Sequence, residues 1–284
     1  MSNPTPPPTT DIMNYTIPFV SPLKSTVAFL GMPSLSLKFF RQLSSFLKLM
    51  FSLERHEVNI LDARKLDDVT FEDTGVTLVE MEAVQDWDSE KQLEQYKKNT
   101  EEAVKKLYAK NPPRKMMWLM DFLKRGGSTG NPPATDGPHL DYYQNWSATI
   151  QFRDGCTPPS SDTPDVVLGI WRPCMMNSPV YDYPLVFMDA ATYKHEHQVR
   201  FEQEFKHTLA DGTVTPVKNL AAHTHYDANQ RWIYYSEVAM NETLIFTHFT
   251  KEKFKANIHC AVKQPLPEGK DTRQSLENRL MLWF

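Results

Sequence analysis

The chain has 284 residues, of which 40% are hydrophobic and 12% aromatic, and its formal net charge is −4. This composition suffices for one large core, and the acidic balance provides no positive field that would attract nucleic-acid phosphates. The three cysteines lack metal-type spacing, which indicates reduced thiols in a cytoplasmic protein and argues against a disulfide framework.

The first ten residues are rich in Pro and Thr and lack the apolar segment of a secretory signal. We therefore expect a flexible tail at residues 1–10 and a single domain over residues 11–284. Residues 27–53 are largely apolar, but Lys38, Arg41 and Lys48 argue against a membrane span. The apolar residues of this segment recur at helical spacing. This favours a helix that faces the core over the alternative, a helix on a membrane surface.

Two short β-type runs at residues 58–61 and 76–81 predict peripheral strands. The clearest helical pattern follows, and it ends before the proline pair at residues 112–113. Ser89 and Gln92 match a capping box at its start. Its apolar residues form one stripe, so we expect one side of this helix to pack on the core.

Residues 125–138 are dense in Gly, Pro, Thr and Ser and predict a loop that ends at His139. Beyond this loop the chain consists mostly of short β-type runs. We expect strands at residues 146–152, 166–171, 185–188, 232–235, 243–248, 256–262 and 275–283. Helical patterns thus lie in the N-terminal half and β-type patterns in the C-terminal half. This order predicts a mainly β fold with α decoration, namely a double-stranded β-helix (jelly-roll, cupin-like) barrel braced by N-terminal helices.

His139 and Asp141 stand two residues apart where a strand is expected to begin, so their side chains would project from one face. A third ligand must come from a strand that is distant in sequence, and His259 in the run 256–262 meets that requirement. Two histidines and one carboxylate form the ligand set of non-haem Fe(II) oxygenases and leave positions on the metal open. We expect these three residues to be the metal ligands and the catalytic residues of an Fe(II) centre.

Dioxygen could take one open position, and a cosubstrate with adjacent keto and carboxylate oxygens could take two. Arg273 and Ser275, again two residues apart, could bind a second carboxylate at the far end of such a cosubstrate, as in 2-oxoglutarate. Arg172 would reach a substrate carboxylate if its strand crossed between the two ligand strands. The structural alternative is pairing of Arg172 with Asp182 or Asp189.

A second His-x-Asp pair, His225 and Asp227, runs into a turn-like segment and leaves too few residues before His259 for the intervening strands. We expect this pair in a hairpin connection. Zinc could bind His-x-His pairs such as those at residues 195–197 and 223–225, but both pairs lie in polar segments without a third ligand, which favours surface positions.

Each chosen residue also has an alternative structural role. His139 could cap the loop, Asp141 could bind nearby amides, and Arg273 could pair with Glu277. If all of these roles were structural, the residues would have the spacing of a ligand set only by accident. A metal site is therefore the stronger explanation.

Several longer motifs match a known family, namely VNILDAR at 58–64, PHLD at 138–141, IWRP at 170–173, YPL at 183–185, WIYY at 232–235 and RQSLENR at 273–279. From about residue 56 to the end, the chain resembles the fungal and bacterial hydroxylase/desaturase family that includes gibberellin desaturase-like, AsaB-like and CmcJ-like proteins. It departs from the family pattern at Cys174 and at Asn257-Ile258, which bears on substrate identity rather than on metal ligation.

The resemblance implies an enzyme of secondary metabolism that uses Fe(II), 2-oxoglutarate and dioxygen to hydroxylate, desaturate or oxidatively cyclise a small metabolite or amino-acid-like molecule. It places the ligand roles on His139, Asp141 and His259 and the cosubstrate roles on Arg273 and Ser275. We expect a small-molecule substrate and neither nucleic acid nor membrane as a partner. The alternatives are a non-catalytic jelly-roll that binds a ligand or metal, and an oxygenase of protein side chains.

Overall fold

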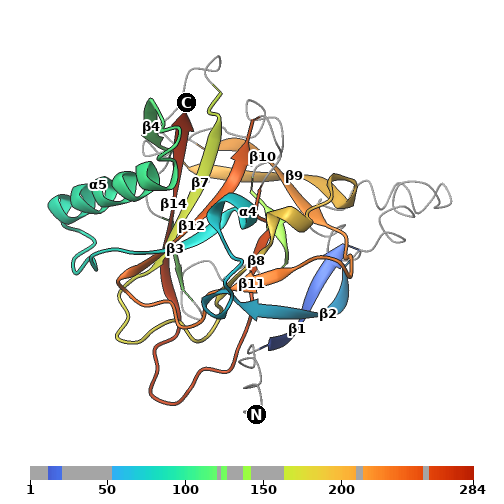
Figure 1. Ribbon diagram of the computed structural model, residues 1–284. Coiled ribbons are helices and arrows are strands. Elements are labelled where there is room, and N and C mark those ends of the chain that lie inside the picture. The colour runs from blue at the N-terminus through green and yellow to red at the C-terminus, as the bar shows by residue number, and fades with distance from the viewer. Residues whose placement is uncertain are drawn as a thin grey trace, which may run out of the picture.

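The structure is a computed structural model, and it describes residues 12–20, 53–119, 123–126, 137–141, 163–208, 214–251 and 256–284. Two β-sheets dominate these residues (Figure 1). The first has eight strands in the order β1-β2-β11-β8-β13-β6-β10-β9. The second has the order β3-β12-β7-β14-β4, and β5 also pairs with β14. The β-rich architecture predicted from the sequence is confirmed.

The strands of the first sheet are β1 Ile12–Val20, β2 Leu53–Asp62, β6 His139–Leu140, β8 Leu185–Met188, β9 Gln198–Thr208, β10 Val214–Thr224, β11 Trp232–Tyr234 and β13 His259–Ala261. Those of the second are β3 Val76–Glu80, β4 Lys115–Trp118, β5 Leu123–Gly126, β7 Val166–Pro173, β12 Glu242–Thr250 and β14 Gln274–Trp283. The helices are η1 Ala63–Lys65, α4 Phe71–Thr74, α5 Glu90–Leu107, η2 Ala190–Thr192 and η3 His195–His197.

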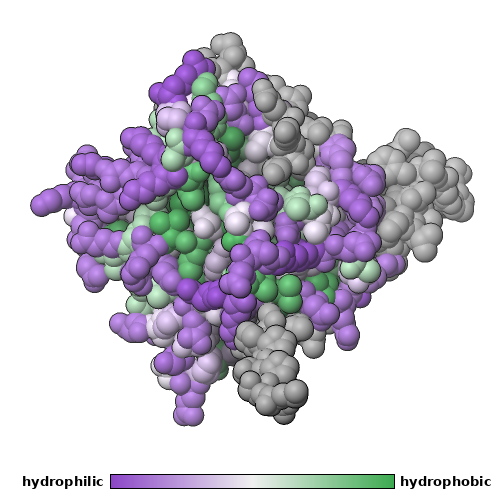
Figure 2. All heavy atoms as spheres, in the orientation of Figure 1, coloured by the Kyte–Doolittle hydropathy of each residue, from purple (hydrophilic) through white to green (hydrophobic). Residues whose placement is uncertain are grey.

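Helix α5 covers the outer face of the second sheet (Figure 1). Its buried residues Tyr96 and Val104 pack in one cluster with Leu168 of β7 and Leu280 of β14. The surface of the molecule over α5 is hydrophilic in Figure 2, as expected for a helix with one apolar stripe. Among the described helices, none is long and apolar enough to cross a membrane.

The start of α5 differs from the predicted capping box. Ser89 is the N-cap residue, but its side chain makes no capping hydrogen bond. The side chain of Gln92 instead accepts hydrogen bonds from the backbone N–H groups of Gln85 at 2.9 Å and Asp86 at 3.2 Å. Gln92 therefore fixes the loop before the helix.

Strand β14 shows how polar residues enter the space between the sheets. Alternate residues of a strand face opposite sides. Leu276 and Leu280 pack with α5, whereas Glu277 and Arg279 contact residues of the first sheet or of β12. The inner side of β14 is therefore charged at Glu277 and Arg279, in a part of the fold where apolar packing is the rule.

The predicted strands that fall on described residues are confirmed, with ends that differ by a few residues. They correspond to β2, β3, β7, β8, β11, β12, β13 and β14. Strands β1, β4, β9 and β10 were not predicted, and the predicted loop 125–138 is wrong at its start because Arg125 and Gly126 belong to β5. The expected tail at 1–10, the helix within 27–53 and the strand at 146–152 lie outside the described residues, except that Leu53 begins β2.

Candidate active site

Two of the predicted ligands, His139 and His259, lie on neighbouring strands of the first sheet. They are directly opposite each other in the register of β6 and β13, so they share one face. Their ring centroids are 4.6 Å apart. Nδ1 of His139 donates to the Gly137 carbonyl at 2.8 Å, and Nδ1 of His259 donates to the Asn257 carbonyl at 3.1 Å. Since each Nδ1 carries the proton, each Nε2 keeps the lone pair that a metal requires.

Asp141 follows β6 directly and uses its two oxygens differently. Oδ1 lies 3.5 Å from Nε2 of His139. Oδ2 accepts a hydrogen bond from Nη2 of Arg279. Burial opposes the charge on Asp141, but the Arg279 guanidinium outweighs it and holds the pKa of this carboxyl well below its usual value. The structure thus brings the three predicted ligands together, and their two imidazoles and one ionised carboxylate fit Fe(II).

Arg273 lines the same small pocket as His139, Asp141 and His259. Its side chain is buried, with Nη1 donating to the Tyr183 carbonyl at 2.7 Å and Nε to Oγ of Ser275 at 3.1 Å. The guanidinium also lies 5.0 Å from the ring centroid of Trp171. The predicted pair Arg273 and Ser275 is therefore a preorganised cation at the pocket wall.

Arg172 is not brought together with these residues. Its strand β7 belongs to the second sheet, so the prediction that it crosses between the two ligand strands is wrong. Nη2 donates to the carbonyls of Met240 and Glu82, and the guanidinium lies 5.6 Å and 5.3 Å from the rings of Trp87 and Tyr96. Arg172 therefore faces α5 and joins the segment before that helix to the β11–β12 connection.

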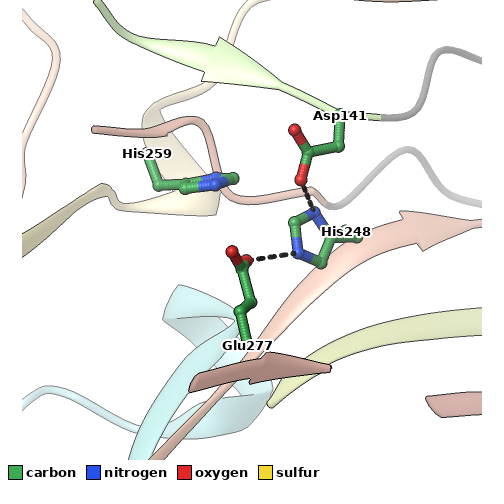
Figure 3. A group of neighbouring side chains, drawn as sticks. All are labelled: Asp141, His248, His259 and Glu277. Carbon is green, nitrogen blue, oxygen red and sulfur yellow. Dashed lines mark ion pairs between the residues drawn. The ribbon is translucent and has the colours of Figure 1, made fainter. Parts of the chain in front are cut away.

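A buried histidine that the sequence did not single out, His248 on β12, lies beside the proposed ligands (Figure 3). The pairing of β12 with β7 shifts register between Thr247 and Phe249, which makes His248 the extra residue of a β-bulge. Gly169 of β7 provides room for the ring, because a Cβ at this position would lie 2.5 Å from Nε2 of His248. Burial, reinforced by Arg279, lowers the pKa of His248 to about 4, so the ring is neutral at neutral pH.

Glu277 and Arg279 complete this buried group from β14. Nη1 of Arg279 lies 2.7 Å from Oε1 of Glu277, which in turn lies 3.8 Å from Nε2 of His248. Figure 3 shows the His248 ring between the carboxylates of Glu277 and Asp141. Strand alternation could have placed Glu277 and Arg279 on the same face as Ser275, whereas nothing in the sequence indicates that Glu277 lies beside His248 and Arg279 beside Asp141.

His223 is buried, so its expected surface position is wrong. It lies opposite His139 in the register of β10 and β6, and its Nδ1 donates to the Pro138 carbonyl at 2.8 Å. Burial, with a contribution from His139, lowers the pKa of His223 to about 3. Together with His259, these residues form a row of three imidazoles across β13, β6 and β10.

The other histidines considered from the sequence lie away from the pocket. His195 is exposed on η3, where His197 is partly exposed. Asp227 lies in the connection between β10 and β11, where it pairs with Lys194 at 2.6 Å. These two strands do not pair with each other, so the expected hairpin is wrong.

A family model described as "Oxidoreductase/YMDC permease-like domain" matches residues 40–283. The chain belongs to this family. Among curated proteins, "Aspirochlorine biosynthesis protein N" of Aspergillus oryzae is 29% identical over 124 residues, which are 42% of this chain and 48% of that protein. The match thus spans about half the length of this relative.

Solved structures match over nearly the whole chain. The iron and alpha-ketoglutarate-dependent endoperoxidase NvfI aligns with a TM-score of 0.66 and 17% identity over 96% of this chain and 98% of that one. A single-residue variant of NvfI aligns with a TM-score of 0.69 and 18% identity over 100% and 99% of the two chains. These likenesses confirm the predicted jelly-roll fold and agree with the family resemblance drawn from the motifs.

Proposed function

We propose that the protein is an Fe(II)- and 2-oxoglutarate-dependent dioxygenase that hydroxylates, desaturates or oxidatively cyclises a small secondary metabolite or amino-acid-like molecule. The observation that carries this proposal is the grouping of His139, Asp141 and His259 at one pocket, with both Nδ1 atoms bonded to backbone carbonyls. The names of the similar proteins, an iron and alpha-ketoglutarate-dependent endoperoxidase and a biosynthesis protein, support it.

Nε2 of His139, Nε2 of His259 and Oδ1 of Asp141 would hold the metal. When bound, Fe(II) with 2-oxoglutarate and dioxygen supplies the oxidant that removes hydrogen from a substrate carbon. The chain contributes the geometry, because the carbonyls of Gly137 and Asn257 fix the tautomer and the direction of each imidazole. The ionised state of Asp141 supplies the one ligand charge.

Arg273 would bind the distal carboxylate of 2-oxoglutarate. Its hydrogen bonds to the Tyr183 carbonyl and to Ser275 hold the guanidinium in place before the cosubstrate arrives. In a buried pocket such a charge-assisted contact is stronger than in water. Leu185 and Ala261 line the same pocket. Cys174 and Cys260 are buried and form no disulfide with another described residue, which fits our assignment of the enzyme to the reducing cytoplasm.

The test is anaerobic addition of Fe(II) and then 2-oxoglutarate, with the weak visible charge-transfer band of the chelated keto acid as the readout. We expect the band in the parent protein and in a His195→Ala control, whose imidazole is exposed and away from the pocket. We expect no band in His139→Ala. A parent protein without the band would contradict the proposal and favour a jelly-roll that binds a ligand or metal without this chemistry.

A further inference from the structure

Arg279 and His248 bridge the same two carboxylate oxygens at the inner side of the pocket. Arg279 Nη2 bonds to Asp141 Oδ2, and Nη1 lies 2.7 Å from Glu277 Oε1. His248 Nδ1 lies 3.7 Å from Asp141 Oδ2, and Nε2 lies 3.8 Å from Glu277 Oε1. Figure 3 shows the imidazole in this bridging position. Each oxygen therefore faces one guanidinium nitrogen and one imidazole nitrogen.

The side chains around this bridge form a metal-type donor set of their own. One ligand atom from each of Asp141, His248, His259 and Glu277 lies within 4.8 Å of the others. Two imidazoles and two carboxylates suit the same divalent metals as the set with His139. The inner set shares Asp141 and His259 with the proposed ligands, so the two sets compete for one metal ion.

A metal in the inner set would be poorly suited to the proposed chemistry. Four protein ligands leave fewer open positions than a chelating keto acid and dioxygen need together. The chain therefore requires a feature that keeps the metal at the outer set, formed by His139, Asp141 and His259.

We propose that Arg279 is a positioning residue whose guanidinium takes the cation position of the inner set and so confines the metal to the outer set. This inference rests on the proposed function, from which it takes the three ligands. The guanidinium places one nitrogen beside an oxygen of each of the two carboxylates, and it stays charged at any pH that the protein tolerates. Because it occupies Oδ2, Asp141 presents Oδ1 alone to the metal.

Removal of the Arg279 charge should move the metal rather than release it. The Asp141 and Glu277 oxygens would then lie on either side of His248 with no fixed cation, and a divalent ion is the natural replacement. Fe(II) or Co(II) would bind with an affinity within about tenfold of the parent, whereas chelation of 2-oxoglutarate would be lost.

The experiment compares the parent with Arg279→Met and with Arg279→Gln, which keeps an amide donor and a similar stem if the Met variant fails to fold. Arg231→Met is the matched control, since Arg231 also pairs with two aspartates, Asp68 at 2.7 Å and Asp189 at 3.4 Å. Apoprotein is titrated with Co(II) by its visible absorption, and the charge-transfer band is then recorded with Fe(II) and 2-oxoglutarate.

For both Arg279 variants we expect retained metal binding, a changed Co(II) spectrum and a band reduced at least fivefold. The added substitution Glu277→Gln should restore the band, because it removes the inner carboxylate. A full band in a folded Arg279 variant would overturn this inference and leave the proposed function standing. Loss of both metal binding and the band in that variant would do the same. A parent protein without the band would overturn the proposed function and this inference with it.

Discussion

In the proposed site, Asp141 would bind a metal through one oxygen and the protein through the other. One oxygen faces His139 and the other is held by Arg279. A carboxylate whose second oxygen is fixed cannot rotate to chelate a metal with both oxygens, so its binding mode is determined before the metal arrives. In the proposed site, Arg279 would thus decide which oxygen of Asp141 is available to the metal.

At the same scale, Arg273→Ala should raise the KM for 2-oxoglutarate by more than tenfold, since a charge-assisted contact to a carboxylate is worth ~2 kcal/mol. The affinity for Fe(II) alone should change little, because Arg273 bonds to Tyr183 and Ser275 and to none of the proposed metal ligands in the hydrogen bonds described above. Steady-state kinetics with varied 2-oxoglutarate and a separate metal titration check both points. An unchanged KM would reassign Arg273 to a structural role.

Among the elements, the connection into β13 matters most to the site, and Asn257 fixes it. Its amide donates to the Thr74 carbonyl at 2.6 Å and to the Met188 carbonyl at 3.2 Å, and its Oδ1 accepts from the Thr247 N–H at 3.1 Å. The backbone carbonyl of the same residue orients His259. A residue at which the sequence departs from the family pattern thus holds α4, β8 and β12 around one ligand.

Asn257→Ala should therefore lower the free energy of unfolding by about 2–3 kcal/mol, because buried partners would lose their hydrogen bonds. The affinity for metal should fall as well, since β13 would lose its attachment. Asn241→Ala is the control, because its amide makes an exposed hydrogen bond to Glu80 and should cost under about 0.5 kcal/mol. Urea denaturation of the two variants distinguishes them, and equal losses would contradict this role of Asn257.

The elements also explain which parts of the site the sequence could predict. His139 and Asp141 are recognisable because neighbours two apart on a strand share a face, and that rule depends on local geometry alone. The predicted position of Arg172 is wrong because it depends on the order of the strands in the sheets. Pairing between distant segments determines that order. His248 lies at a β-bulge, where simple alternation fails. Strands β9 and β10 escaped prediction because polar residues interrupt their apolar pattern.

For the whole molecule, three buried imidazoles contribute to the loss of stability in acid. Burial lowers the pKa values of His223, His248 and His259 from 6.5 to about 3, about 4 and about 3. Below pH 6.5 the unfolded chain binds protons that the folded chain does not. The free energy of unfolding of the metal-free protein should therefore fall between pH 6.5 and about pH 4, by up to ~1.4 kcal/mol per pH unit for each histidine.

Thermal or urea denaturation across this pH range measures the slope directly. His223→Asn should reduce it by up to ~1.4 kcal/mol per pH unit, and the exposed His195→Asn should leave it unchanged. A slope that is the same in both variants and the parent would show that His223 titrates alike in the folded and unfolded states.

The jelly-roll places side chains from two sheets around one pocket. The first sheet and the residue after β6 supply the three proposed metal ligands, and Arg279 of the second sheet supplies the charge that holds Asp141. A crystal structure determined anaerobically with Fe(II) and 2-oxoglutarate tests this arrangement most directly. We predict a metal bonded to Nε2 of His139, Nε2 of His259 and Oδ1 of Asp141, with Arg279 still on Oδ2. A metal bonded to His248 or Glu277 instead of His139 would contradict it.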